Sequence, residues 1–121
     1  MNVKCLDHVN IRTLDVDAAA QFYTDLLGLE RRDPPTLYPG ENALWMHAED
    51  GRAVLHLRTY ACEPGSTGVI DHIAFDCTGK DEVMAKVKDM GLWFAENKGD
   101  GWSVIYTRDP QGVTLELYFP D

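Results

Sequence analysis

The sequence predicts an α+β fold in which a βαβββ module occurs twice in tandem, and three observations support this. First, residues 6–11, Leu-Asp-His-Val-Asn-Ile, return as residues 70–75, Ile-Asp-His-Ile-Ala-Phe. Second, each copy continues with a helical pattern, a short strand and two longer strands. Third, 121 residues are enough for one domain, or for two half-size modules that share one core. We therefore predict one domain, 1–121, with module 1 at 1–60, a linker at 61–68 and module 2 at 69–121.

Both modules contain an amphipathic helix. The first helix is predicted from an Asp15 cap to Leu27, with a glycine just past its end. The second is predicted from near Asp81 to Met90, and again a glycine follows. Apolar residues recur at helical spacing in both, which gives each helix one buried face: Ala19, Phe22, Tyr23 and Leu26 in the first, and Val83, Val87 and Met90 in the second.

Each module is predicted to end in a β-hairpin. Pro34 and Pro35 break module 1 after its short strand, because proline lacks the N–H that a strand or helix interior needs. Pro64, Gly65 and Gly68 mark the linker between the modules. The hairpins comprise strands 43–48 and 53–59 around the turn 49–52, and strands 102–107 and 113–119 around the turn 109–112.

Strand alternation separates an apolar face from a polar face in the strands that begin and end each module. The apolar faces suit packing under a helix. On the opposite faces, one imidazole or carboxylate is expected in the middle of each of four strands, at equivalent positions of the repeat. These groups have the ligand chemistry of a first-row divalent metal, and two histidines with one carboxylate leave coordination positions open. They are His8, His56, His72 and Glu116.

Three neighbouring residues are expected to stay outside this set. His47 has no counterpart in module 2, and we expect it to be structural or exposed. Asp7 and Asp71 each precede a candidate ligand, but alternation predicts that they point away from it. On this argument, the two aspartates do not orient the imidazoles that follow them.

Composition excludes several classes of function. Twenty acidic and 11 basic residues leave a net charge of −9, which disfavours a nucleic-acid partner and an anionic membrane surface. No apolar stretch approaches the roughly 18–20 residues of a bilayer span, and the first residues lack a signal-peptide core, so we expect a cytoplasmic protein. Three cysteines without a C-x-x-C spacing exclude a disulfide framework and a zinc ribbon.

Over essentially its full length, the chain resembles the vicinal oxygen chelate superfamily. The resemblance rests on the duplicated pattern, on Phe22-Tyr23 followed by Leu-Gly-Leu at 27–29, and on Asp-Pro-Gln-Gly at 109–112 ahead of Glu116. The superfamily includes glyoxalase I, extradiol dioxygenases, fosfomycin-resistance thiol transferases, methylmalonyl-CoA epimerase and metal-free bleomycin-binding proteins. It implies that the two modules curl into a cupped mixed sheet around a metal, with the helices on the outer face.

The segment 106–116 is similar to extradiol dioxygenases, in which a tyrosine precedes an acid-Pro-x-Gly turn and the glutamate ligand. This resemblance implies that His8, His72 and Glu116 hold Fe(II) and that Tyr106 hydrogen-bonds a small catecholic or related oxygen-chelating substrate. It also implies that His56 is the acid–base residue, while a role as fourth ligand stays open. Two features depart from the pattern: residues 96–100 lack a further histidine, and the familiar enzymes are about twice as long.

Two alternatives remain. The chain also resembles glyoxalase I, a lyase that would use Ni or Zn (Mn is a further option); there the position of His56 is normally a glutamate, and Arg12 matches an arginine that grips a glutathione carboxylate. The other alternative is a non-catalytic protein that binds a small molecule. We also expect a homodimer, because each module offers an open sheet and the linker is short. The candidate substrate-binding residues are Asn10, Arg12 and Tyr118.

Overall fold

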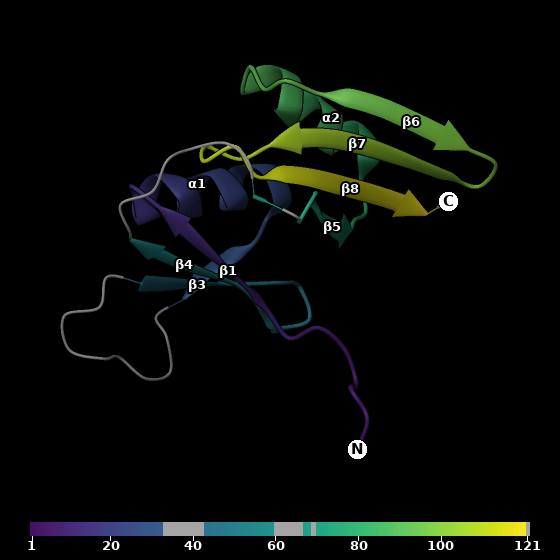
Figure 1. Ribbon diagram of the computed structural model, residues 1–121. Helices are drawn as coiled ribbons and strands as arrows, with labels where there is room; N and C mark the ends of the chain where they lie inside the picture. Colours follow the sequence, from purple (N-terminus) through teal and green to yellow (C-terminus); the bar gives the residue numbers. More distant parts are fainter. Residues whose placement is uncertain (33–42, 60–66, 69, 121) are drawn as a thin grey trace. The chain divides into compact units, whose positions relative to one another are not determined.

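The computed structural model describes residues 1–32, 43–59, 67–68 and 70–120 (Figure 1). Its backbone forms two compact units, Met1–Cys62 and Glu63–Asp121, each with a four-stranded mixed sheet and one helix. This is the predicted α+β fold with two βαβββ modules. The Pro34–Pro35 break and most of the predicted linker lie outside the described residues.

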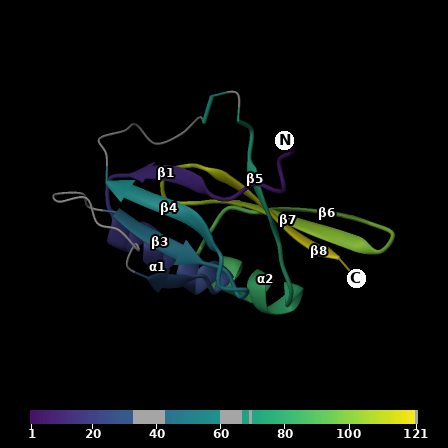
Figure 2. The same ribbon diagram turned by 90° about the horizontal axis from the view of Figure 1, so that it is seen from below.

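In unit 1 the sheet has the strand order β1-β4-β3-β2, in which β1 runs parallel to β4 and the other neighbours are antiparallel. The helix α1 packs against β2, β3 and β4 through its buried stripe, and Figure 2 shows it along one side of these strands. The elements are β1 (Val9–Thr13), α1 (Val16–Leu27), β2 (Glu30–Arg32), β3 (Ala43–His47) and β4 (Ala53–Thr59).

The ends of α1 lie where the sequence predicts them. The Asp15 side chain accepts a hydrogen bond from the backbone N–H of Ala18 at 3.1 Å, which satisfies one of the free donors of the first turn. At the other end Gly28 adopts φ 68°, a left-handed conformation that costs glycine little. Local capping chemistry therefore accounts for the bounds of this helix.

Unit 2 repeats the arrangement, with the strand order β5-β8-β7-β6 and β5 parallel to β8. Its helix α2 buries Val83 and Val87, as predicted, but begins at Lys80 behind a Gly79 cap that supplies no side chain. The elements are β5 (Ile73–Asp76), α2 (Lys80–Asp89), β6 (Ala95–Gly99), β7 (Trp102–Arg108) and β8 (Thr114–Pro120).

The turn between β7 and β8 is built around a buried carboxylate. Asp109 Oδ1 accepts hydrogen bonds from the backbone N–H groups of Gln111 and Val113, at 2.9 and 2.8 Å. Gly112 supplies the positive φ of 89° that this tight turn needs. The Asp-Pro-Gln-Gly motif is therefore the structural device that starts β8 in the register that carries Glu116.

Strand pairing gives the two sheets the same register. In unit 1, His56 on β4 lies between Asn10 on β1 and Trp45 on β3. In unit 2, Glu116 on β8 lies between Ala74 on β5 and Tyr106 on β7. His56 and Glu116 therefore occupy equivalent positions, on the face opposite the buried leucines of their strands. This confirms the predicted alternation of β4 and β8.

The other two candidate ligands lie differently from the prediction. His8 and His72 do not stand in mid-strand, because β1 begins at Val9 and β5 at Ile73. Each histidine is the last residue before its strand. Neither is part of the strand ladder, so pleat alternation does not govern how it and its preceding neighbour point.

Candidate metal centre

In unit 2 a histidine, a carboxylate and a phenol come together at the start of β5. His72 Nε2 lies 4.0 Å from Glu116 Oε2, and the His72 ring stands edge-on to the Tyr106 ring, with centroids 6.3 Å apart. The Tyr106 hydroxyl donates a hydrogen bond to Glu116 Oε1 at 2.9 Å. Antiparallel pairing of β8 with β7 places Glu116 and Tyr106 directly opposite each other on one face, and His72, the residue before β5, lies beside them.

The phenol of Tyr106 holds one oxygen of Glu116 and leaves the other facing His72. The hydrogen bond to this carboxylate raises the pKa of Tyr106, and partial burial and the negative charges of Glu116 and Asp71 add to the rise. The phenol therefore keeps its proton at neutral pH and remains a donor. Glu116 itself is half-buried, with 22% of its side chain exposed.

In unit 1 an indole joins two imidazoles. The Trp45 ring stacks on His56, with centroids 4.3 Å apart and planes within 4°, while His8 meets Trp45 edge-on at 4.7 Å. The centroids of the two imidazoles are 6.3 Å apart. Asn10 Nδ2 donates a hydrogen bond to His56 Nδ1 at 2.9 Å. Stacking on Trp45 therefore fixes the plane of the His56 ring, and the hydrogen bond from Asn10 fixes its rotation within that plane.

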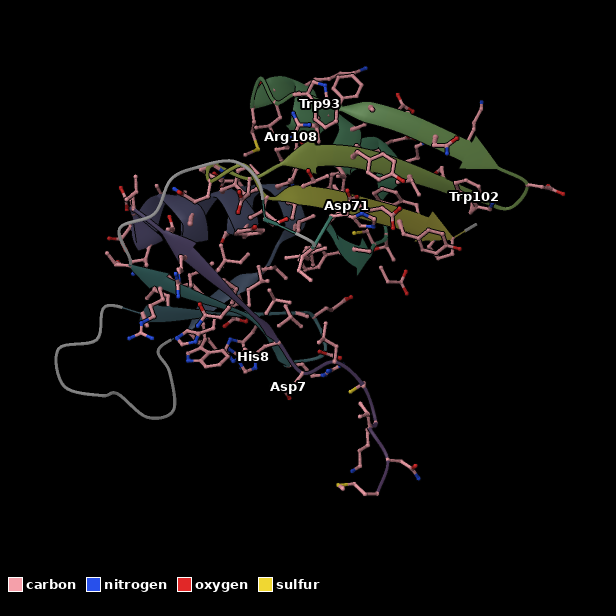
Figure 3. All side chains as sticks on the ribbon, viewed as in Figure 1. Asp7, His8, Asp71, Trp93, Trp102 and Arg108 are labelled. Carbon is pink, nitrogen blue, oxygen red and sulfur yellow. The ribbon has the colours of Figure 1, made fainter. Side chains whose placement is uncertain are left out.

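The aspartates that precede two of the candidate ligands contradict the alternation argument. Asp7 Oδ2 lies 2.7 Å from His8 Nδ1, and Asp71 Oδ2 lies 2.8 Å from His72 Nδ1. Figure 3 labels Asp7 and His8 side by side just ahead of β1, and Asp71 near β8. The prediction was wrong because these residues precede the pleated strands and their side chains are free to turn toward each other. The sequence feature that could have predicted this contact is the Asp-His pair, which is present in both copies of the repeat.

These hydrogen bonds determine which ring nitrogen carries the proton in each neutral histidine. A carboxylate only accepts, so the hydrogen bond to Asp7 or Asp71 requires a proton on Nδ1 of His8 or His72, and the lone pair of the neutral ring stays on Nε2. In His56 the proton and the lone pair exchange places. Its Nδ1 accepts from an amide N–H, so the neutral ring carries its proton on Nε2.

The three predicted ligands are divided between the units. His72 and Glu116 lie together in unit 2, while His8 belongs to unit 1 and lies beside Trp45 and His56. Among the described residues, no three His, Cys, Asp or Glu side chains gather within one metal site. The three-ligand set therefore stays a prediction.

The remaining candidates lie on exposed strand positions. Arg12 pairs with Arg58 in the register of β1 and β4, two residues beyond Asn10 and His56, and both arginines are exposed. Tyr118 on β8 is also exposed, two residues beyond Glu116. His47, predicted to be structural or exposed, is half-buried, and its Nδ1 has no hydrogen-bond partner among the described residues.

Comparisons with solved structures find the same fold. In structure, the chain is similar to a glyoxylase/bleomycin resistance protein/dioxygenase domain from Frankia sp. EAN1pec, with a TM-score of 0.83 and 16% identity over 99% of this chain and 94% of that one. A glyoxalase/dioxygenase from Nostoc punctiforme matches with a TM-score of 0.83 and 21% identity over 99% and 93%. The fosfomycin resistance protein FosX from Listeria monocytogenes matches with a TM-score of 0.78 and 17% identity over 99% and 94%.

In sequence, the uncharacterized protein YwbC of Bacillus subtilis is 25% identical over 122 residues, which cover 95% of this chain and 97% of that protein. Neither described helix has the length and apolar character of a membrane span. The family model of the Glyoxalase/Bleomycin resistance protein/Dioxygenase superfamily matches residues 5–117. The chain therefore belongs to the Glyoxalase/Bleomycin resistance protein/Dioxygenase superfamily.

Proposed function

We propose that this protein is a metal-dependent enzyme that binds one divalent ion through His8, His72 and Glu116 and acts on a small substrate that chelates the ion through its oxygens. Within this class we propose an Fe(II) dioxygenase of the extradiol type. The observation that carries the proposal is the difference in tautomer: two rings keep their lone pair on Nε2 for a metal, and His56 keeps a proton there.

The donor set in unit 2 fits a first-row divalent ion. Imidazole nitrogen and carboxylate oxygen each lie about 2.0–2.2 Å from such an ion, so two ligand atoms of one ion are at most about 4.2–4.4 Å apart. The 4.0 Å between His72 Nε2 and Glu116 Oε2 is within this limit, and it is too long for a hydrogen bond. In a facial set the ligand atoms subtend about 90° at the ion and lie about 3 Å apart, so the two side chains would close by about 1 Å when the ion binds. His8, with the same tautomer as His72, is the proposed third ligand.

Glu116 is suited to bind through one oxygen only. Tyr106 donates to Oε1 and so leaves Oε2 on the side of His72. A hydrogen bond from a residue that is not itself a metal ligand orients the ligating carboxylate and reduces the negative charge on its oxygens. We therefore propose that Tyr106 acts on the carboxylate, in addition to the predicted contact with substrate.

His56 is suited to proton transfer. With Nδ1 accepting from Asn10, the Nε2–H of the neutral ring can donate a hydrogen bond to a substrate oxygen. Rotation of the Asn10 amide would offer Oδ1 to an Nδ1–H and leave the Nε2 lone pair to act as a base. The imidazolium formed when Nε2 takes a proton from the substrate could then return that proton to a substrate oxygen. Stacking on Trp45 holds the ring plane through both states. Bound Fe(II) would supply open coordination positions for the substrate oxygens and for dioxygen, while the catechol itself would supply the electrons that reduce dioxygen.

A glyoxalase-type lyase or isomerase that uses Ni, Zn or Mn is the second candidate. Arg12 and Arg58 lie side by side on the polar face, next to Asn10 and His56, and two guanidinium groups there favour an anionic substrate. Among the structural relatives, a mutant of FosX from Listeria monocytogenes was crystallised in complex with Mn(II) and 1S,2S-dihydroxypropylphosphonic acid. A small-molecule binding protein without turnover is the third candidate.

The deciding experiment is anaerobic reconstitution with Fe(II), followed by air and a panel of catechols. Yellow ring-cleavage product supports the dioxygenase. Turnover of a thiol hemiacetal by the Ni or Zn form supports the lyase, and tight binding without turnover of either supports the binding protein. For the dioxygenase, Tyr106→Phe and His56→Gln should keep their iron and lose about 10²–10⁴-fold in rate. Full turnover by both variants would contradict the roles of these residues.

We also propose that the protein is a cytoplasmic homodimer, in keeping with its acidic composition and its open sheets. A monomer mass from light scattering at micromolar concentration would contradict the dimer.

A further inference from the structure

We propose that Asp7 and Asp71 are positioning residues that set the tautomers of His8 and His72 and thereby present both Nε2 atoms as metal ligands. The inference rests on the proposed metal site. It gives a role to two residues that strand alternation had predicted to point away from the histidines. The role is exerted on the imidazole rings before any ion binds.

The geometry of each pair is the same. Carboxylate oxygen and ring nitrogen are 2.7 Å apart in Asp7–His8 and 2.8 Å apart in Asp71–His72, the short distances of a charge-assisted hydrogen bond. The shared proton lies on Nδ1, because the carboxylate can only accept. In unit 2 the opposite atom of the ring, Nε2, is directed toward Glu116 Oε2 at 4.0 Å.

The pairs occur only at the proposed ligands. Of the four histidines in the chain, His8 and His72 have an aspartate before them, and both aspartates make the contact. His56 takes its hydrogen bond from an amide, and the Nδ1 of His47 has no hydrogen-bond partner among the described residues. The two units differ at neighbouring positions, where Asn10 corresponds to Ala74, yet both keep the Asp-His pair.

A neutral imidazole without such a partner would exist as a mixture of two tautomers, with the proton on Nδ1 in some molecules and on Nε2 in others. The hydrogen bond that one nitrogen makes decides which nitrogen is left for the metal. Removal of a partner of this kind lowers metal affinity by about 10–100-fold. The aspartate side chains are themselves exposed, 88% for Asp7 and 91% for Asp71, so replacing them leaves the packed core intact.

The first test is the protonation of the rings in the metal-free protein, read from long-range ¹H–¹⁵N spectra at about pH 8, where imidazole is mostly neutral. We expect Nδ1–H for His8 and His72, and Nε2–H for His56. Asp71→Ala should move His72 toward Nε2–H and leave His8 unchanged, and Asp7→Ala should do the reverse. Asp71→Asn keeps a carbonyl oxygen that can accept, so its shift should be smaller.

The second test is Co(II) affinity by calorimetry. Asp71→Ala should weaken binding about 10–100-fold and Asp71→Asn less. Asp100→Asn, in the exposed turn between β6 and β7, removes the same charge and should bind as the wild type does. Nε2–H on His72 in the wild type, or an unchanged affinity in Asp71→Ala, would overturn the inference. If the wild type binds no Co(II), the proposed function fails, and the ring spectra still decide whether the aspartates set the tautomers.

Discussion

Units 1 and 2 share one backbone plan and place different chemistry at the same positions. The central row of polar-face residues is Asn10, His56 and Trp45 in unit 1, and Ala74, Glu116 and Tyr106 in unit 2. Unit 1 thus offers an imidazole held by an amide and an indole. Unit 2 offers a carboxylate held by a phenol. The Asp-His pair ahead of the first strand is common to both.

On the proposed function, the two units supply different groups to the reaction. Unit 2 contributes two proposed ligands, and unit 1 contributes one ligand together with the group proposed to move protons. Among the described residues, neither unit holds all the groups that the proposed reaction needs. A protein with two copies of unit 1 would lack the carboxylate ligand, and one with two copies of unit 2 would lack the imidazole proposed to move protons.

The largest expected effect is on metal content, and it should differ between substitutions of His72 and of His56. His72→Ala should abolish metal binding, because it removes a ligand, whereas His56→Gln should keep wild-type metal content and lose its turnover. Metal analysis of both variants, purified without chelator, measures the contrast. Equal metal in wild type and His72→Ala would contradict the ligand assignment. Metal loss in His56→Gln would instead make His56 a fourth ligand.

A second effect separates the described cysteines of the two units. Burial, and then the charge of Asp76, raise the pKa of Cys77 to about 11, while Cys5 is exposed. At pH 8 the thiolate fraction of Cys77 is then about 10⁻³, so its alkylation should be slow and rise about tenfold per pH unit up to pH 11. Iodoacetamide labelling followed by peptide mass spectrometry checks both sites. Cys5→Ser provides the control, and rapid labelling of Cys77 at pH 8 would contradict its burial.

The smallest effect separates the two helices. Asp15→Ala removes the side-chain cap of α1 and should lower the free energy of unfolding by about 1 kcal/mol. The equivalent cap of α2, Gly79, donates no side chain and has φ 74°, so no matching cap exists to remove. Urea unfolding of Asp15→Ala measures the effect, and Asp15→Asn, which removes the charge but keeps a capping oxygen, is the charge control. An equal loss in both variants would assign the effect to charge near the helix start.

Local sequence signals predicted the elements well. The cap at Asp15 and the glycine at 28 predict the bounds of α1, because capping involves groups only a few residues apart. Strand alternation predicts that His56 and Glu116 lie opposite buried leucines, and the structure agrees. The same rule failed at His8 and His72, where it was applied one residue outside the strands.

The sequence alone was thus enough to predict the order of the elements, the faces of β4 and β8, and the residue types available for chemistry. Which of those residues touch depends on how the strands pair in the folded chain. The hydrogen bonds from Tyr106 to Glu116 and from Asn10 to His56 join residues 10 and 46 positions apart, across paired strands. Such contacts depend on strand register, and register is set by how whole strands pair and bury their apolar faces rather than by the residues next to the site.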